Sequence, residues 1–143
     1  MSRSELLVER EIHGRSYGPL YETAHQLCLR HRVDGGLPQP GLFWTLKRDQ
    51  DRLPILQLDR KLNETGEAGK SSLPQLKLAT ALLLVAAQDF EAAKHHYAAL
   101  SANTAPREVR LKALASWQSM ALLEGDFQKA LDLENQLGLD FPE

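Results

Sequence analysis

One cysteine and two histidines have the residue types and spacing of a candidate metal or nucleophile site. His25, Cys28 and His31 are three residues apart in a segment with helical periodicity. Each step of three residues turns a helical side chain back by about 60°, so the two histidines diverge by about 120° and lie about 9 Å apart along the axis. One pair could share a metal ion, but zinc sites take three or four protein ligands. The other three histidines belong to other segments and point to different faces: His13, His95 and His96. We therefore expect no metal site, and a buried Cys28 beside half-exposed histidines.

Residues 66–71, with the sequence GEAGKS, look like the end of a phosphate-binding loop. A complete loop needs a glycine five residues before its second glycine, so that backbone N–H groups can wrap the phosphates. Glu64 occupies that position, and its carboxylate would repel a phosphate. A polar loop is therefore the better interpretation of this segment.

Nucleophilic and acid–base catalysis have no recognisable constellation in this chain. Cys28 has histidines nearby, but no nucleophile turn or oxyanion-hole pattern accompanies it. The acidic residues are scattered over expected helix starts and solvated faces, and no carboxylate pair stands out. We therefore expect no catalytic residue, no cofactor and no enzymatic activity.

The composition describes one globular domain of ordinary size. The chain has 143 residues, of which 43% are hydrophobic and 6% aromatic, and its many Leu and Ala residues favour helices. Its net charge of −2 lacks the basic excess of most nucleic-acid binders, so nucleic acid is not an expected partner. The single cysteine excludes an intrachain disulfide, which favours a reducing, cytoplasmic location. The longest apolar stretch, residues 78–87, has roughly half the length needed to span a bilayer, so no membrane is expected.

Residues 1–62 are predicted to form an N-terminal helical portion. A weak helix is expected over residues 2–14 and a second helix over residues 19–34, separated by a turn that contains glycine and proline. A turn-rich connector follows at residues 36–41, because prolines and glycines there cannot continue a helix. Residues 42–62 favour a helix, although a proline and a locally alternating apolar pattern leave a strand open.

The second half of the chain has stronger helical signals. Residues 63–72 are polar and are predicted to be a loop or linker, and residues 73–143 are predicted to contain two αα-hairpins. Ser72 and Gln75 have capping-box spacing and open the first helix. The other three helices are expected over residues 89–100, 104–124 and 126–137. The chain as a whole is therefore expected to be all-α and one compact domain.

The two hairpins repeat each other in sequence. Asp89 and Phe90 align with Asp126 and Phe127, 37 positions later, and the alignment continues through the pairs Ala93 with Ala130 and Leu100 with Leu137. A repeat of this length made of two helices is typical of solenoid proteins.

Around these residues the chain resembles the tetratricopeptide repeat family, over about residues 73–141. Residues 124–130 (EGDFQKA) match the turn of that family, in which glycine or aspartate and an aromatic residue precede an alanine, and residues 88–93 (QDFEAA) match it with glutamine in place of glycine. The repeat is longer than the roughly 34 residues of the family, and Thr80-Ala81 and Trp117-Gln118 replace its bulky residue and glycine. The resemblance implies antiparallel αα-hairpins with packed N-terminal helices, and repeat packing at six positions: Phe90, Ala93, Tyr97, Trp117, Phe127 and Ala130.

The resemblance also implies a groove lined by the first helix of each hairpin. The positions that would line it are Gln75, Leu78, Leu82, Val85, Lys112, Ala115, Ser119 and Leu122. Most are aliphatic or small, which indicates an apolar or amphipathic helix, or an extended apolar peptide, rather than a partner's terminal carboxylate. The alternative is that the N-terminal helices cover these leucines and leave no groove.

These observations predict a non-catalytic protein–protein interaction module: an adaptor or scaffold, a chaperone-like protein or a complex subunit. Its partner is expected to be another protein or a second copy of itself. Two repeats are fewer than the three or so needed for stability, so the N-terminal portion or a partner is expected to support them. The alternatives are an obligate homo-oligomeric structural subunit and a small metal-binding or enzymatic helical protein.

Overall fold

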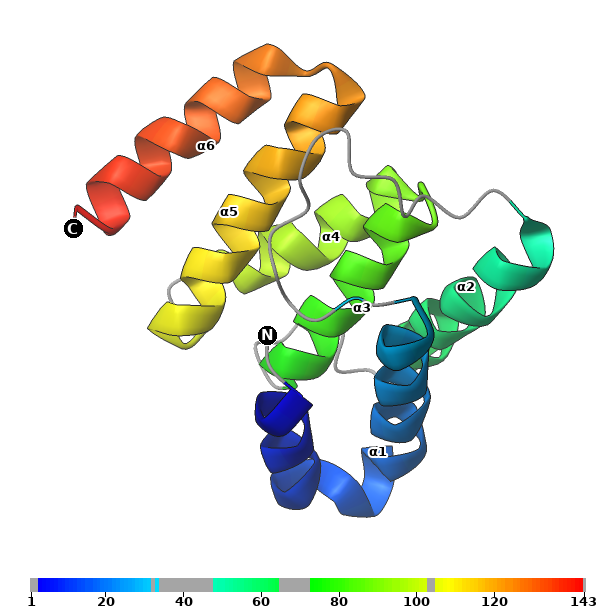
Figure 1. Ribbon diagram of the computed structural model, residues 1–143. Helices are drawn as coiled ribbons and strands as arrows, with labels where there is room; N and C mark the ends of the chain where they lie inside the picture. Colours follow the sequence, from blue (N-terminus) through cyan, green and yellow to red (C-terminus); the bar gives the residue numbers. More distant parts are fainter. Residues whose placement is uncertain (1–2, 32, 34–47, 65–72, 103–104, 143) are drawn as a thin grey trace.

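The computed structural model describes residues 3–31, 33, 48–64, 73–102 and 105–142. Every regular element within these ranges is an α-helix, which confirms the predicted all-α fold (Figure 1). The helices are α1 (Arg3–His31), α2 (Asp49–Glu64), α3 (Pro74–Ala86), α4 (Phe90–Leu100), α5 (Arg107–Glu124) and α6 (Phe127–Asp140).

The N-terminal helix α1 is continuous, whereas two separate helices were predicted. Pro19 lies inside it, and Figure 1 shows that the helix axis bends sharply between its ends. A proline has no N–H for the helical hydrogen bond and bends a helix rather than always ending it. Leu6 and Tyr21, from the two arms of the bend, are both buried in the main core. These tertiary contacts hold the arms in helical form despite the unfavourable local sequence.

Residues 42–62 were predicted as a helix with a strand as the alternative, and the described part of this segment is helical. Residues 49–64 form a helix, and its buried residues Ile55, Leu58 and Leu62 have the spacing of one helical face. Two residues of the predicted loop, Asn63 and Glu64, continue this helix. The predicted connector at 36–41, the apolar residues 42–46 and the remaining loop residues lie outside the described part of the chain.

Helix α3 is the central element of the core. All eleven residues from 76 to 86 are buried, and α1, α2, α4 and α5 pack around it. The N-cap residue is Leu73, which has a left-handed backbone and no side-chain hydrogen bond to the helix, and the predicted cap Ser72 lies outside the described residues. The carboxylate of Glu9 instead accepts hydrogen bonds from the backbone N–H groups of Gln75 and Leu76, both at 2.8 Å. A residue of α1 therefore caps α3.

The turns α3–α4 and α5–α6 have the same backbone geometry, 37 residues apart. Gln88 (φ 64°) and Gly125 (φ 79°) both adopt the left-handed conformation. In each turn the next residue, Asp89 or Asp126, donates its N–H over 2.9 Å to the carbonyl oxygen five residues earlier. This is the pattern of a Schellman helix ending. The predicted equivalence of the two turns is confirmed.

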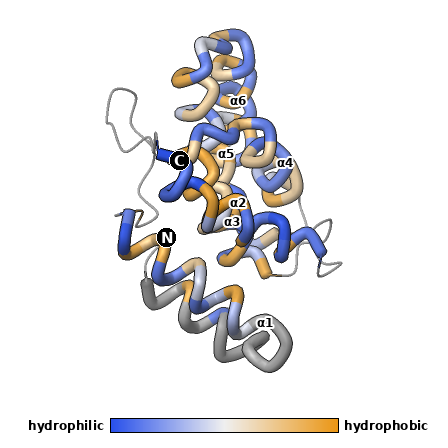
Figure 2. The backbone as a smooth tube through the Cα atoms, turned by 90° about the vertical axis from the view of Figure 1, so that its right-hand side faces the viewer, coloured by the Kyte–Doolittle hydropathy of each residue, from blue (hydrophilic) through white to orange (hydrophobic). Residues whose placement is uncertain are grey.

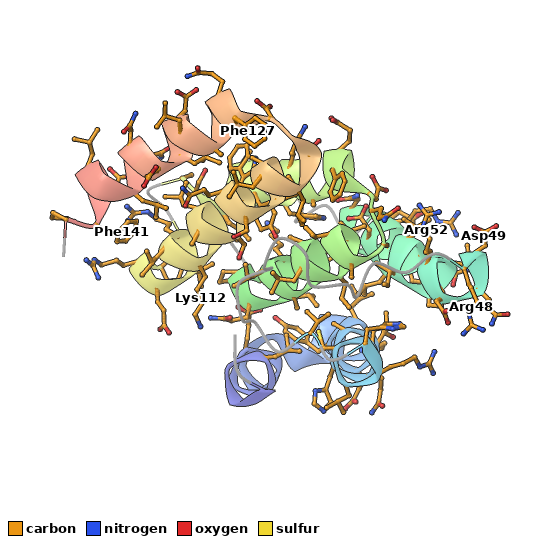
Figure 3. All side chains as sticks on the ribbon, turned by 45° about the horizontal axis from the view of Figure 1, so that its top comes forward. Arg48, Asp49, Arg52, Lys112, Phe127 and Phe141 are labelled. Atoms are coloured by element: carbon orange, nitrogen blue, oxygen red, sulfur yellow. The ribbon has the colours of Figure 1, made fainter. Side chains whose placement is uncertain are left out.

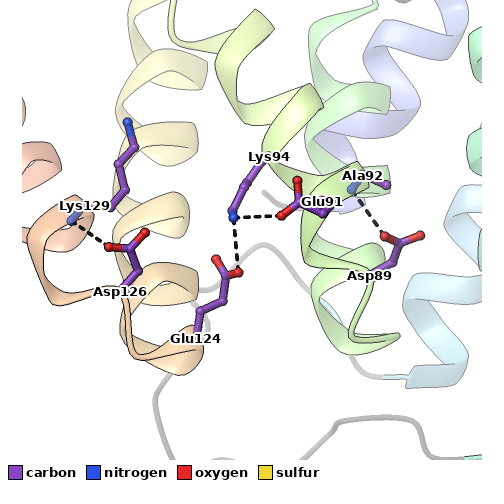
Figure 4. Close-up of polar contacts among 7 residues, drawn as sticks. All are labelled: Asp89, Glu91, Ala92, Lys94, Glu124, Asp126 and Lys129. Carbon is purple, nitrogen blue, oxygen red and sulfur yellow. Dashed lines mark hydrogen bonds and ion pairs between the residues drawn. The ribbon is translucent and has the colours of Figure 1, made fainter.

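The same two aspartates cap the helices that follow. Asp89 accepts a hydrogen bond from the N–H of Ala92 at 3.3 Å, and Asp126 accepts one from the N–H of Lys129 at 3.2 Å (Figure 4). A cap of this kind stabilises a helix start by about 1 kcal/mol. Helix α5, in contrast, starts after Pro106 without a side-chain cap.

Helix α3 packs on α4, α4 contacts α5, and α6 packs on α5 at the edge of the molecule (Figure 1). The rings of Tyr97 and Trp117 are stacked across the α4–α5 contact, with centroids 6.4 Å apart. The ammonium group of Lys94 lies 3.2 Å from the carboxylate of Glu124 and 3.1 Å from that of Glu91 (Figure 4). These contacts join α4 to α5.

Candidate binding face on the last two helices

The predicted groove is closed on its α3 side. Leu78, Leu82 and Val85 are each only 1% exposed, because α1 and α2 pack over α3. Gln75 is half-buried, and its backbone N–H is bound by Glu9. The prediction of an open groove is wrong for these four residues, which belong to the core and its edge.

The α5 side of the predicted groove is partly open. Lys112, Ala115 and Ser119 are half-buried, and Leu122 is exposed. The ammonium group of Lys112 lies 3.5 Å from the carboxylate of Glu108, one turn earlier. These four positions therefore retain access to solvent, which Leu78, Leu82 and Val85 on α3 have lost.

A pocket of about 390 Å³ lies between α5 and α6. Its lining is mostly apolar and consists of Arg107, Leu111, Ala115, Leu137, Gly138 and Phe141. A Cβ atom added at Gly138 would meet no atom within 4 Å, so the glycine leaves space that a side chain could fill. The guanidinium carbon atoms of Arg107 and Arg110 lie 4.9 and 5.2 Å from the ring centroid of Phe141.

Two exposed apolar side chains lie in the first half of α6, toward the end away from this pocket. Phe127 is 69% exposed and Leu131 is 51% exposed. These two residues are one helical turn apart, and Gly138 follows on the same side of the helix after two further turns. We call Phe127, Leu131 and the pocket residues the outer face. Figure 2 shows how hydrophobic and hydrophilic positions alternate along α6, and Figure 3 shows Phe127 and Phe141 at opposite ends of that helix.

The exposure of Phe127 corrects one of the six predicted packing positions. Ala93, Tyr97 and Ala130 are buried, and Phe90 and Trp117 are half-buried and packed against the core. Phe127 was expected to pack like Phe90, its counterpart in the first hairpin. The reason for the difference is that α4 lies between α3 and α5, whereas no described helix follows α6 in the same way.

Acidic side chains lie along α6 near the outer face. Asp126, Asp132 and Glu134 are exposed. With about 100° per residue, Glu134, seven residues after Phe127, projects on the same side as Phe127 and lies between Leu131 and Gly138, whereas Asp132 projects about 100° away from Leu131. The amide of Gln128 donates a hydrogen bond to Asp132 over 3.0 Å. The carboxylate of Glu134 therefore separates Leu131 from the pocket end of α6.

Lys129, near the start of α6, makes a cation–π contact with α5. The ammonium group of Lys129 lies 4.3 Å from the ring centroid of Trp117, on the inner side of the helix. A cation over an aromatic ring is attracted by the negative ring face. Lys129 therefore points away from Phe127 and Leu131.

The candidate metal residues do not form a ligand set. Cys28 is buried as predicted, His25 is buried rather than half-exposed, and His31 is half-buried. Burial lowers the pKa of His31, against the opposing effect of the Asp51 carboxylate. Among the described side chains, no group of three or more His, Cys, Asp or Glu residues could hold a metal ion. The residues 66–71 lie outside the described part of the chain.

Sequence reasoning missed a buried polar pair between α2 and α4. The Nε2 atom of His96 lies 2.5 Å from a carboxylate oxygen of Asp59, and His96 is buried. His95 is exposed, so the two adjacent histidines do point to different faces as predicted. The available signal was the position of His96, three residues after the buried Ala93 and four before Leu100, on the apolar face of its helix.

Comparison of the chain with family models, with curated proteins and with solved structures finds no match. No helix in the described part of the chain combines the length and the apolar character needed to cross a membrane. The outer face is thus the feature from which a function can be inferred.

Proposed function

We propose that this protein is a non-catalytic protein-binding module that receives an amphipathic helical segment of a partner on its outer face. The observation that carries the proposal is the exposure of Phe127. Its repeat counterpart, Phe90, packs against the core, whereas Phe127 is 69% exposed one helical turn before the exposed Leu131. Large apolar side chains that are exposed close together are typical of interaction sites.

The shape of the outer face supports a helical occupant. Helix-in-groove recognition uses apolar side chains at intervals of three, four and seven residues. Phe127, Leu131 and Gly138 present that spacing on one side of α6. The pocket at the Gly138 end has room for an apolar side chain of the partner. A partner helix would then lie beside α6 as α5 lies beside α4.

The same proposal includes a structural relationship to tetratricopeptide repeats and a cytoplasmic location. The equivalent turns, 37 residues apart, support a pair of related αα-hairpins. The exposed side chains of Phe127 and Leu131 are a surface that a partner helix would cover. Cys28 is the one cysteine of the sequence and is buried, and a chain with a single cysteine suits a reducing compartment.

The test is site-specific photo-cross-linking in the full chain, inside its native cell. A photoreactive residue replaces Phe127 in one variant and Ala98, which is exposed on α4, in the control. We expect one discrete adduct with a different protein from position 127, and none from position 98. Adding Leu131→Glu should abolish the adduct, because a buried carboxylate without a partner is costly.

Two results would contradict this function. Absence of an adduct at position 127, or equal adducts at both positions, would show that the outer face does not bind a protein. An adduct with twice the mass of the chain would show instead that a second copy covers the face, as in the homo-oligomeric alternative.

A further inference from the structure

We infer that the partner helix carries one basic residue between two apolar residues, and that this lysine or arginine pairs with Glu134. This inference rests on the proposed function and adds the residue pattern that the outer face would recognise. It depends on the place of Glu134 on α6, and on the contacts that the equivalent positions of α4 make with α5.

Glu134 lies in the path of a helix that covers both ends of the outer face. Phe127, Leu131, Glu134 and Gly138 follow one another on the same side of α6, at intervals of four, three and four residues. With a rise of about 1.5 Å per residue, Glu134 is about 4.5 Å from Leu131 and about 6 Å from Gly138 along the helix axis. A partner helix that lies along α6 and contacts both Leu131 and the pocket must therefore also cover Glu134.

The carboxylate of Glu134 needs a partner once it is covered. It is exposed, and within the described part of the chain it forms no ion pair or side-chain hydrogen bond. Asp126 and Asp132, in contrast, accept hydrogen bonds from Lys129 and Gln128 of the same helix. An ionised carboxylate that loses its water without gaining a partner is costly. A purely apolar helix would impose that cost, whereas a lysine or arginine at the facing position would pair with Glu134.

The first hairpin shows how the equivalent face is covered. The residues 37 positions before Leu131 and Glu134 are Lys94 and Tyr97 of α4. The ammonium group of Lys94 lies 3.2 Å from the carboxylate of Glu124 on α5, and the ring of Tyr97 is stacked on a ring of α5. These positions of α4 are thus covered by a helix, and the charged residue among them meets the opposite charge on that helix. A partner helix that covers α6 would complete the second hairpin in the same way, with the signs of the two charges exchanged.

The basic residue is expected at this one position and not along the whole partner helix. Arg107 lines the pocket, and its guanidinium carbon lies 4.9 Å from the ring centroid of Phe141. The guanidinium carbon of Arg110 lies 5.2 Å from the same centroid. A cation of the partner at the pocket would be repelled by these groups, because like charges across an interface oppose association. The residue that enters the pocket is therefore apolar, and the basic residue lies one helical turn away from it.

Two synthetic helices of identical composition test this pattern. The paired probe has leucines at positions i, i+7 and i+11 and a single lysine at i+4, so that the leucines can meet the pocket, Leu131 and Phe127 while the lysine meets Glu134. In the displaced probe the lysine exchanges places with a glutamine on the opposite face, which keeps the net charge. Binding of each probe to the full chain is measured by fluorescence anisotropy. We expect the paired probe to bind at least about tenfold more tightly.

Charge reversal on α6 gives the matching experiment. Glu134→Lys should invert the preference, so that the displaced probe binds more tightly than the paired probe. The control is Asp132→Lys, because Asp132 is exposed on the same helix but projects about 100° away from Leu131. It changes the net charge of the protein by the same amount and should leave the preference unchanged. Phe127→Ser should weaken binding of both probes, because it removes an apolar contact that they share.

Several results would overturn the inference. Equal binding of the two probes, lost in Phe127→Ser, would show that Glu134 selects no cation and would leave the proposed function intact. Inversion of the preference in Asp132→Lys as well as in Glu134→Lys would show that only net charge matters. Binding of neither probe would also overturn it, and the cross-link at position 127 would then decide separately whether the proposed function stands. Dimerisation that Phe127→Ser abolishes in sedimentation would overturn it by identifying a second copy as the occupant.

Discussion

The carboxylate of Glu9 accepts a hydrogen bond from the backbone N–H of Leu76 at 2.8 Å, across 67 positions of the chain. It also accepts hydrogen bonds from the N–H of Gln75 at 2.8 Å and from the hydroxyl of Tyr21 at 2.7 Å. The first N–H groups of a helix have no partner within the helix and attract negative charge. Glu9 therefore ties both arms of α1 to the start of the central helix.

Replacing Glu9 should destabilise the whole domain. In Glu9→Ala the N–H groups of Gln75 and Leu76 and the hydroxyl of Tyr21 lose a buried acceptor. We expect the free energy of unfolding in urea to fall by roughly 2–4 kcal/mol. Glu9→Gln keeps one acceptor oxygen and should lose about half as much. The control is Gln26→Ala, on the exposed side of α1, which should change stability by less than about 0.5 kcal/mol. Equal effects of Glu9→Ala and the control would contradict the cap.

Stability should fall at alkaline pH through the buried tyrosines. Burial, together with the hydrogen bond and negative charge of Glu9, raises the pKa of Tyr21 far above its usual value of 10.0. Burial also raises the pKa of Tyr97. The unfolded chain therefore loses these protons near pH 10 while the folded chain keeps them, so stability is full below that pH and declines above it.

Urea unfolding between pH 8 and 11 measures this decline. Tyr21→Phe should be less stable than the parent at neutral pH, because the hydrogen bond to Glu9 is lost, and its stability should fall less steeply with pH. The tyrosine absorbance should show that ionisation of the remaining buried ring accompanies unfolding. An identical slope in the parent and in Tyr21→Phe would show that Tyr21 titrates normally in the folded chain.

The two equivalent turns should respond in opposite ways to glycine substitutions. Gly125→Ala places a Cβ where no atom lies within 4 Å, so the effect is confined to its positive φ of 79°. A left-handed non-glycine residue costs about 1 kcal/mol, and the free energy of unfolding should fall by that amount. Gln88→Gly removes the same strain from the first turn and should raise stability by up to about 1 kcal/mol. A change of the same sign in both variants would mean that the turns are not equivalent.

Sequence reasoning succeeded where hydrogen bonds are local. The Asp89-Phe90 and Asp126-Phe127 turns were found because each is built from residues within one turn of helix. The cap by Glu9 was not found, because its partners are 66 and 67 positions away and no local pattern links them. The same limit explains why the sequence predicts that one helix ends at Gly14 and another starts at Pro19, where the structure has one helix.

For the candidate site too, the sequence predicts local patterns but not the contacts between distant helices. The leucines of α3 have a helical apolar pattern, which is the same for an open groove and for a core helix, and only the packing of α1 and α2 decides between them. Phe127 was expected to be packed because Phe90 is its sequence counterpart. Its exposure depends on the neighbour that each helix has in space. A periodic pattern identifies an apolar face, but burial of that face depends on the other elements.

Filling the pocket should separate binding from stability. Gly138 lies within α6, and an added Cβ meets no atom within 4 Å. Gly138→Leu should therefore raise stability by up to about 1 kcal/mol, since leucine is a far better helix former than glycine. Its side chain would occupy the space of the pocket and exclude a side chain of the partner. The yield of the cross-linked adduct from position 127 should fall at least about tenfold.

The matched control for this variant is Gly18→Leu. Gly18 is another helical glycine at which an added Cβ meets no atom within 4 Å, and it lies in α1, away from the outer face. Gly18→Leu should leave the yield of the cross-linked adduct from position 127 unchanged. If Gly138→Leu is at least as stable as the parent but no longer binds the partner, the loss of binding cannot come from unfolding, which would lower stability. The pocket would then be part of the partner site. Unchanged binding in Gly138→Leu would restrict the site to Phe127 and Leu131.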